Sequence, residues 1–218
     1  MIEKLQYITQ ETATLSHIDC VREACIAGVK WVQLRVKEKT HEEYLIIAKE
    51  AKIICDLYDV TLIINDDVNI AKKINAHGVH LGKTDMYISE ARMILGENAI
   101  IGGTANTQKD VERLIEQKAD YIGLGPYSHT ETKRNLSPVI GLGGYDEILN
   151  ELKTYYSLEE TPIIAIGGID LYDVEPIFRT GIYGVAISGV ITNNFSITQG
   201  LLKIIERNVF KLDALYKS

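Results

Sequence analysis

Short apolar segments alternate with longer amphipathic segments along the whole chain. The short segments are almost continuously apolar and rich in β-branched residues, which is typical of strands buried on both faces of a parallel sheet. We predict strands at Leu5–Thr9, Trp31–Leu34, Thr61–Ile64, Gly78–Leu81, Ala99–Gly102, Tyr121–Leu124, Ile163–Ile166 and Val185–Ser188. The pattern therefore predicts eight parallel strands.

The segments between these strands have the periodicity of helices. In one of them, Tyr44, Ala48, Ala51 and Cys55 recur every three or four residues, as they would on one buried helix face. The same periodicity predicts helices over residues 17–27, 40–58, 68–75, 87–95, 107–117, 143–155, 171–179 and 196–208.

A strand followed by a helix, repeated eight times, predicts an α/β protein of the (β/α)8 TIM-barrel type. A doubly wound open sheet is the alternative, but such sheets usually have fewer strands. No Pro/Ser-rich linker or change of composition divides the sequence, so we expect one catalytic domain over residues 1–218. In a barrel of this type, the active site lies at the C-terminal ends of the strands.

Composition narrows the functional classes. The 218 residues carry a net charge of −7, which argues against a nucleic-acid or anionic-membrane surface. No apolar run approaches the roughly 20 residues needed to span a bilayer, and the first residues lack a signal-peptide pattern. Cys20, Cys25 and Cys55 are isolated and read as reduced core residues. We expect a cytoplasmic enzyme, either a monomer or a homo-oligomer.

Acidic residues follow two consecutive predicted strands. Asn65, Asp66 and Asp67 come directly after the third strand, and Asp85 follows the fourth. Because these strand ends share one face of a barrel, the carboxylates converge there and fit Mg²⁺ bound to a phosphorylated substrate. The alternative is that the aspartates cap the next helix. We favour Asp66 and Asp85 as metal ligands and Asp67 as a helix cap.

Cationic and amide side chains follow the second strand. Gln33 comes first, and Arg35 and Lys37 then alternate along an extended segment, so these two cations can point to the same side and hold a pyrophosphate. A solvated charged loop is the alternative explanation. The long connection between residues 125 and 141 is also polar, and such connections are usually functional or mobile.

Glycines follow the seventh and eighth strands, at Gly167-Gly168 and Ser188-Gly189. Glycine lets backbone N–H groups approach a phosphate closely, and this is the recurring phosphate site of (β/α)8 barrels. A tight turn without a ligand would explain either pair alone. Together with the acidic and cationic strand ends, the glycines predict two anionic sites and hence two phosphorylated small-molecule substrates.

The same strand ends offer no obvious general base. Neither a Ser–His–Asp nor a Cys–His arrangement is evident, so covalent catalysis is not supported. His80 lies within a strand, and we interpret it as a hydrogen-bonded core histidine. Trp31 and Tyr121 are expected in the core.

Taken together, these segments resemble the thiamine-phosphate synthase family from Tyr7 to about Ile191. The resemblance rests on the segments Gln33–Lys37, Ile64–Asp67, Gly78–Asp85, Tyr121–Pro126, Thr130–Lys133 and Ala165–Ile169. Each segment is weak alone, but the set in this order is highly specific. It implies a transferase that joins a hydroxymethylpyrimidine diphosphate to a thiazole phosphate, giving thiamine phosphate and pyrophosphate.

The resemblance also implies roles for individual residues. Those expected to hold the pyrimidine diphosphate are Gln33, Arg35, Lys37, Asn65, Thr104 and Lys133, with Arg35, Lys37 and Lys133 as catalytic cations. Those expected to hold the thiazole phosphate are Thr130, Thr132, Gly167, Gly168, Ser188 and Gly189. Asp66 and Asp85 would bind Mg²⁺. In the family's dissociative reaction pyrophosphate leaves first, which explains why no base is needed.

Three positions depart from the family pattern. Lys83 stands where the family usually has glutamine, the loop at residues 102–106 is unusual, and Gly189 replaces a common serine. Two rival functions remain at this point. A thiazole tautomerase needs neither a diphosphate nor a metal, and a non-catalytic phosphate-binding barrel would bind ligand without turnover.

Overall fold

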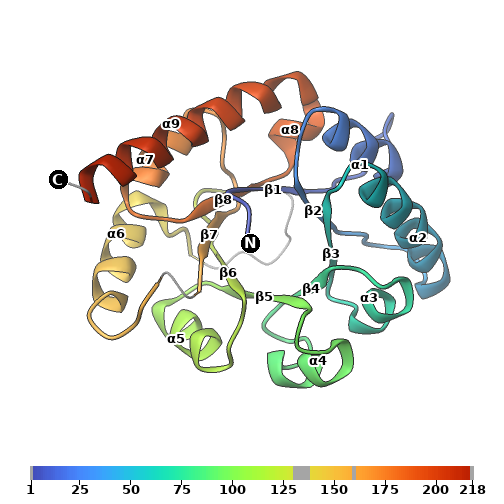
Figure 1. The fold of residues 1–218 in the computed structure, drawn as a ribbon, viewed down its shortest axis with the longest axis horizontal. Helices are drawn as coiled ribbons and strands as arrows, with labels where there is room; N and C mark the ends of the chain where they lie inside the picture. The colour runs from blue at the N-terminus through green and yellow to red at the C-terminus, as the bar shows by residue number, and fades with distance from the viewer. Residues whose placement is uncertain (1, 130–137, 159–160, 217–218) are drawn as a thin grey trace.

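The computed structural model describes residues 2–129, 138–158 and 161–216, with side chains as far as Asn208. Eight parallel strands form a closed barrel in which each strand pairs with its sequence neighbours, and β1 pairs with β8. The helices surround this ring (Figure 1). The strands are β1 (Leu5–Ile8), β2 (Trp31–Leu34), β3 (Thr61–Asn65), β4 (Gly78–Leu81), β5 (Ile100–Ala105), β6 (Tyr121–Leu124), β7 (Ile163–Ile166) and β8 (Gly184–Ile187). The predicted (β/α)8 barrel is confirmed.

Several helices begin at capping residues that are visible in the sequence. The side chains of Ser16, Thr40 and Thr107 each accept a hydrogen bond from a backbone N–H in the first turn, and each belongs to a full capping box. The helices are α1 (His17–Ile26), α2 (His41–Leu57), α3 (Val68–Ile74), α4 (Ile88–Leu95), α5 (Gln108–Glu116), α6 (Gly141–Leu152), α7 (Val174–Arg179), α8 (Gly189–Asn193) and α9 (Thr198–Tyr216), with the 3₁₀ helix η1 at Phe195–Ile197.

Two apolar cores support the barrel. The larger one lies between the strands and the helices, and all three cysteines are buried in it as free thiols. The smaller one fills the barrel interior, where Trp31 and Tyr121 meet edge to face at 4.8 Å between ring centroids. Burial of both rings confirms their assignment to the core.

Alternation along the strands sends every second side chain into the barrel, and the character of these side chains changes along the barrel axis. Near the strand starts the inward residues are apolar, such as Trp31 and Ile100. Two or four residues further on they include Gln33, His80 and Thr104, which are polar. Since all strands are parallel, these polar positions collect at the C-terminal end of the barrel.

The structure differs from the predicted boundaries in two places that matter for the site. Strand β5 continues to Ala105, because Thr104 and Ala105 still pair with Gly123 and Leu124 of β6. The short helix α8 was not predicted, since five residues are too few to establish a helical period. Within the described part of the chain, none of the helices has the length and apolar character needed to cross a bilayer.

Candidate active site

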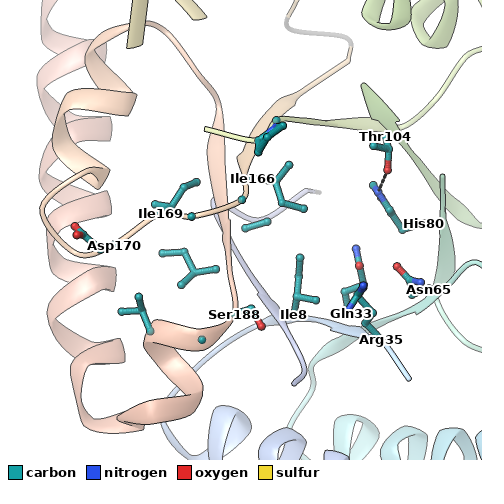
Figure 2. A pocket seen from close by; sticks show the side chains of 18 of the residues that line it. Ile8, Gln33, Arg35, Asn65, His80, Thr104, Ile166, Ile169, Asp170 and Ser188 are labelled. Atoms are coloured by element: carbon teal, nitrogen blue, oxygen red, sulfur yellow. Dashed lines mark hydrogen bonds between the residues drawn. The ribbon is translucent and has the colours of Figure 1, made fainter. Parts of the chain in front are cut away.

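A cavity of about 370 Å³ opens at the C-terminal end of the barrel. In Figure 2, Gln33, Arg35 and Asn65 lie on one side of it, and Ile169 and Asp170 lie opposite. Among the predicted site residues, those that line the cavity are Gln33, Arg35, Asn65, Thr104, Gly167, Gly168, Ser188 and Gly189. The structure therefore brings most of the predicted set, from five different strand ends, around one space.

Two cations extend from β2 beside the cavity. The backbone N–H of Arg35 donates to the Thr9 hydroxyl at 3.0 Å, which fixes the start of the segment. Burial lowers the pKa of the Arg35 guanidinium, and the nearby charge of Asp66 opposes this shift. Lys37 does not line the cavity, and its Nζ lies 2.5 Å from Asp66 Oδ2. Both cations are thus held close to an acidic group.

Asp66 and Asp85 meet at the same edge, as predicted. Burial raises the pKa of Asp85, and the nearby charge of Asp66 raises it further, although the N–H of Gly82 at 2.7 Å acts in the opposite direction. Asp66 also adopts a left-handed backbone conformation with φ of 66°, which is unfavourable for most residues. Two carboxylates held together in this way fit a bound cation.

The donor set has the composition that Mg²⁺ uses with phosphorylated substrates. Mg²⁺ typically takes one or two protein carboxylates, keeps several waters and binds substrate phosphate oxygens. Across the residues that the structure describes, there is no group of three or more His, Cys, Asp or Glu side chains that could hold a metal alone. The pair therefore fits a metal that arrives with a phosphorylated substrate better than a permanent structural metal.

Asp67 has a different function from its neighbour. Its Oδ1 accepts a hydrogen bond of 2.8 Å from the N–H of Ile70, so it is the N-cap of α3. Its Oδ2 lies 3.1 Å from Nδ1 of His41. The prediction that Asp67 caps the helix is confirmed.

The opposite side of the cavity includes glycine backbone beside the side chains of Ile169 and Asp170. Gly167 and Gly168 have φ of 92° and 70°, values that side chains disfavour. A Cβ atom at Gly168 would lie 2.3 Å from Oγ of Ser128, so glycine is required for space as well as conformation. Ser188 and Gly189 follow, and the Ser188 hydroxyl donates to Gln10 at 3.3 Å. This side can offer N–H groups to a phosphate without a cationic side chain.

Several cavity residues were absent from the predicted site. His80 was assigned only to the core, yet it is both buried and part of the cavity lining. Asn106 also lines the cavity and donates a hydrogen bond from Nδ2 to the Gly125 carbonyl. Strand alternation shows which side His80 faces, but its height along the barrel axis depends on the strand register.

The unusual Lys83 is not paired with the metal-site carboxylates. Its Nζ lies 2.6 Å from Asp110 Oδ2, near the start of α5. The extra cation is therefore engaged by an acidic partner of its own. The remaining predicted residues Thr130, Thr132 and Lys133 lie outside the described residues.

Fold and site define a class of protein: a (β/α)8 barrel with a cavity at the C-terminal ends of its strands, lined by cationic, amide and glycine residues. The family model for "Thiamine monophosphate synthase" matches residues 5–191. Thiamine-phosphate synthase from Flavobacterium johnsoniae is 46% identical over 194 residues, which cover 89% of this chain and 91% of that one. The Bacteroides fragilis enzyme of the same name is 47% identical over 187 residues, covering 86% and 91%.

A solved structure agrees with these relatives. Thiamine phosphate pyrophosphorylase from Pyrococcus furiosus superposes with a TM-score of 0.80 at 29% identity, over 94% of this chain and 96% of that one. The chain belongs to the thiamine monophosphate synthase family. Members of this family are transferases of thiamine biosynthesis.

Proposed function

We propose that the chain joins 4-amino-2-methyl-5-(diphosphooxymethyl)pyrimidine to 4-methyl-5-(2-phosphooxyethyl)thiazole, or to its carboxylated form. The products are thiamine phosphate and pyrophosphate. One observation carries the proposal: a single cavity has Arg35 with the amides of Gln33 and Asn65 on one side, called here the charged side, and three glycines on the other, the glycine side. The diphosphate would bind on the charged side and the monophosphate on the glycine side. The pyrimidine carbon that loses pyrophosphate and the thiazole nitrogen would then meet between the two sides.

The charged side would hold the pyrimidine diphosphate. Gln33, Arg35 and Asn65 line the cavity there, while Lys37 lies just outside it on Asp66. We infer that Lys133 and Lys37 join Arg35 around the diphosphate, and that Thr104 contacts the pyrimidine ring. These cations would stabilise the negative charge that grows on the departing pyrophosphate.

The glycine side would hold the thiazole phosphate. We assign the phosphate to Gly167, Gly168, Ser188 and Gly189, with Thr130 and Thr132 from the long connection. Their main task is to hold the thiazole nitrogen against the cation formed when pyrophosphate leaves. No residue needs to remove a proton, which agrees with the lack of a base among the predicted site residues.

Enzymes of this family use a metal ion, and we propose that the metal here is Mg²⁺ on Asp66 and Asp85. When bound, Mg²⁺ supplies positive charge to the leaving pyrophosphate. The carboxylate contact between these two residues supports the assignment. We further propose that residues 1–218 form one catalytic domain.

The test is to incubate the purified protein with both phosphorylated substrates, with Mg²⁺ and with excess chelator. We expect thiamine phosphate and pyrophosphate in equal amounts only when Mg²⁺ is present. Absence of both products in each condition would contradict the proposal. A non-catalytic barrel would bind substrate without turnover, and a tautomerase would isomerise the carboxylated thiazole without the pyrimidine diphosphate.

A further inference from the structure

A chain of hydrogen bonds runs through the barrel interior to the cavity. It begins at Gln33, whose Nε2 donates to Gln6 Oε1 at 3.3 Å, and Gln6 Nε2 donates to the Tyr121 hydroxyl at 3.3 Å. The Tyr121 oxygen lies 3.0 Å from Nδ1 of His80, and Nε2 of His80 lies 3.0 Å from Oγ1 of Thr104. Both ends of this chain lie at the cavity, because Gln33 also lines it, and Figure 2 shows the link between His80 and Thr104 as a dashed line.

Two glycines make room for this chain. A Cβ atom on Gly102 would lie 2.1 Å from the Tyr121 ring, so no other residue at this position would let the ring cross the interior as it does. A Cβ atom on Gly123 would come within 3.2 Å of Cε1 of His80. Gly102, one of the two glycines of β5, therefore has a local cause: it admits the ring that contacts His80.

The direction of each hydrogen bond follows from the Tyr121 hydroxyl. Burial raises the pKa of Tyr121, so the phenol keeps its proton, although hydrogen bonds from Gln6 and Gln33 oppose the shift. Its oxygen accepts from Gln6, so its hydrogen is left for His80 Nδ1. If Nδ1 carried a proton instead, the buried phenol hydrogen would lose that acceptor, which is costly.

We propose that Tyr121 and His80 are positioning residues that fix the Thr104 hydroxyl as a hydrogen-bond donor toward the substrate. With Nδ1 accepting, the proton of neutral His80 sits on Nε2 and is donated to Thr104. The Thr104 oxygen is then occupied as an acceptor, and its own hydrogen points to the cavity. The atom it recognises is an acceptor, such as the ring nitrogen of a heteroaromatic substrate.

This inference rests on the proposed function, because it assumes that a pyrimidine faces Thr104. The first measurement does not require activity: ¹⁵N NMR of the imidazole nitrogens of His80 in the full-length protein. We expect an unprotonated Nδ1 and a protonated Nε2. A proton on Nδ1 would overturn the inference, whereas absence of product from the wild-type protein would count against the proposed function alone.

The second measurement is a double-mutant cycle in steady-state kinetics. Tyr121→Phe and Thr104→Val should each raise KM for the pyrimidine diphosphate about threefold to tenfold, the value of one neutral hydrogen bond. In both variants, kcat should stay unchanged, and so should the KM for the thiazole phosphate. Since Tyr121 acts through Thr104, the double variant should be no worse than Thr104→Val alone, and additive effects would overturn the inference.

Two further variants complete the cycle. Thr104→Ser keeps the hydroxyl and should restore KM to near the wild-type value. Tyr183→Phe removes a phenol that donates to the Ile2 carbonyl at 2.6 Å, before the start of β8 and hence at the opposite end of the barrel. It should leave both KM values unchanged. A rise in KM equal to that of Tyr121→Phe would mean that any lost tyrosine hydroxyl has this effect.

Discussion

Asp66 and Asp67 are adjacent and identical in type, so exchanging each one separately tests the metal assignment directly. Asp66→Asn keeps a residue that tolerates the left-handed backbone at φ of 66°, whereas alanine would add strain. The exchange removes the carboxylate that meets Asp85 and pairs with Lys37. Any effect on activity can then be attributed to the lost charge.

The magnitudes follow from the contacts. The Lys37–Asp66 pair is well exposed, with side-chain exposures of 49% and 35%, so its loss should change the free energy of unfolding by less than about 1 kcal/mol. Loss of an electrostatic contact to the leaving group should reduce kcat by about 10²–10³-fold. Asp66→Asn should therefore be folded and nearly inactive.

Asp67→Ala is the matched control, and we expect it to lose stability while it keeps its activity. It removes the hydrogen bond to the Ile70 N–H, so it should cost about 1 kcal/mol of stability. For a chain of this size, such a loss lowers Tm by about 2–4 °C. The Asp67 carboxylate caps α3, so kcat should stay within about twofold of wild type, a small change compared with the loss expected for Asp66→Asn.

The assay is pyrophosphate release at saturating concentrations of both substrates across a Mg²⁺ titration, with thermal unfolding of the same samples. The metal assignment requires that Asp66→Asn lose activity without a loss of Tm. Wild-type activity in Asp66→Asn, or an equal loss of activity in Asp67→Ala, would refute it.

Two further predictions use the glycine side of the cavity and His77. Gly168→Ala places a Cβ against Ser128 in a strained conformation, so KM for the thiazole phosphate should rise while KM for the pyrimidine diphosphate stays constant; the reverse pattern would exchange the two subsites. Desolvation lowers the pKa of His77, whose Nδ1 accepts a hydrogen bond from the Leu62 N–H. As the pH is lowered through the ordinary value near 6.5, the unfolded chain takes up a proton on this residue before the folded chain does, so the free energy of unfolding decreases. His77→Asn should reduce the stability lost between about pH 7.5 and about pH 5.5 in urea unfolding, and an unchanged loss would contradict this origin.

The sequence was sufficient to predict the barrel because two kinds of segment alternate without a break. Strands buried on both faces form continuous apolar runs, the segments between them have a helical period, and eight such units left few alternatives. The same logic placed Gln33, Arg35 and Asn65 at one barrel end, and the structure confirms that they share a cavity.

Contacts between residues of different strand–helix units could not be predicted in the same way. The hydrogen bonds of His80 with Tyr121 and Thr104 depend on the stagger between β4, β5 and β6, and no single strand pattern contains that stagger. The pairing of Lys83 with Asp110 likewise depends on where α5 begins. Sequence patterns identify the residues that face the site, whereas strand register decides which of them touch.

On the proposed assignment, the Lys37–Asp66 ion pair would make the two ligands of the charged side thermodynamically interdependent. While Lys37 occupies Asp66, it offsets the charge that a divalent cation would otherwise meet. A diphosphate that drew Lys37 away would expose Asp66 to the cation, and a cation on Asp66 would free Lys37 for the diphosphate. Linkage requires this coupling to be reciprocal, so each ligand should raise the affinity for the other by the same factor.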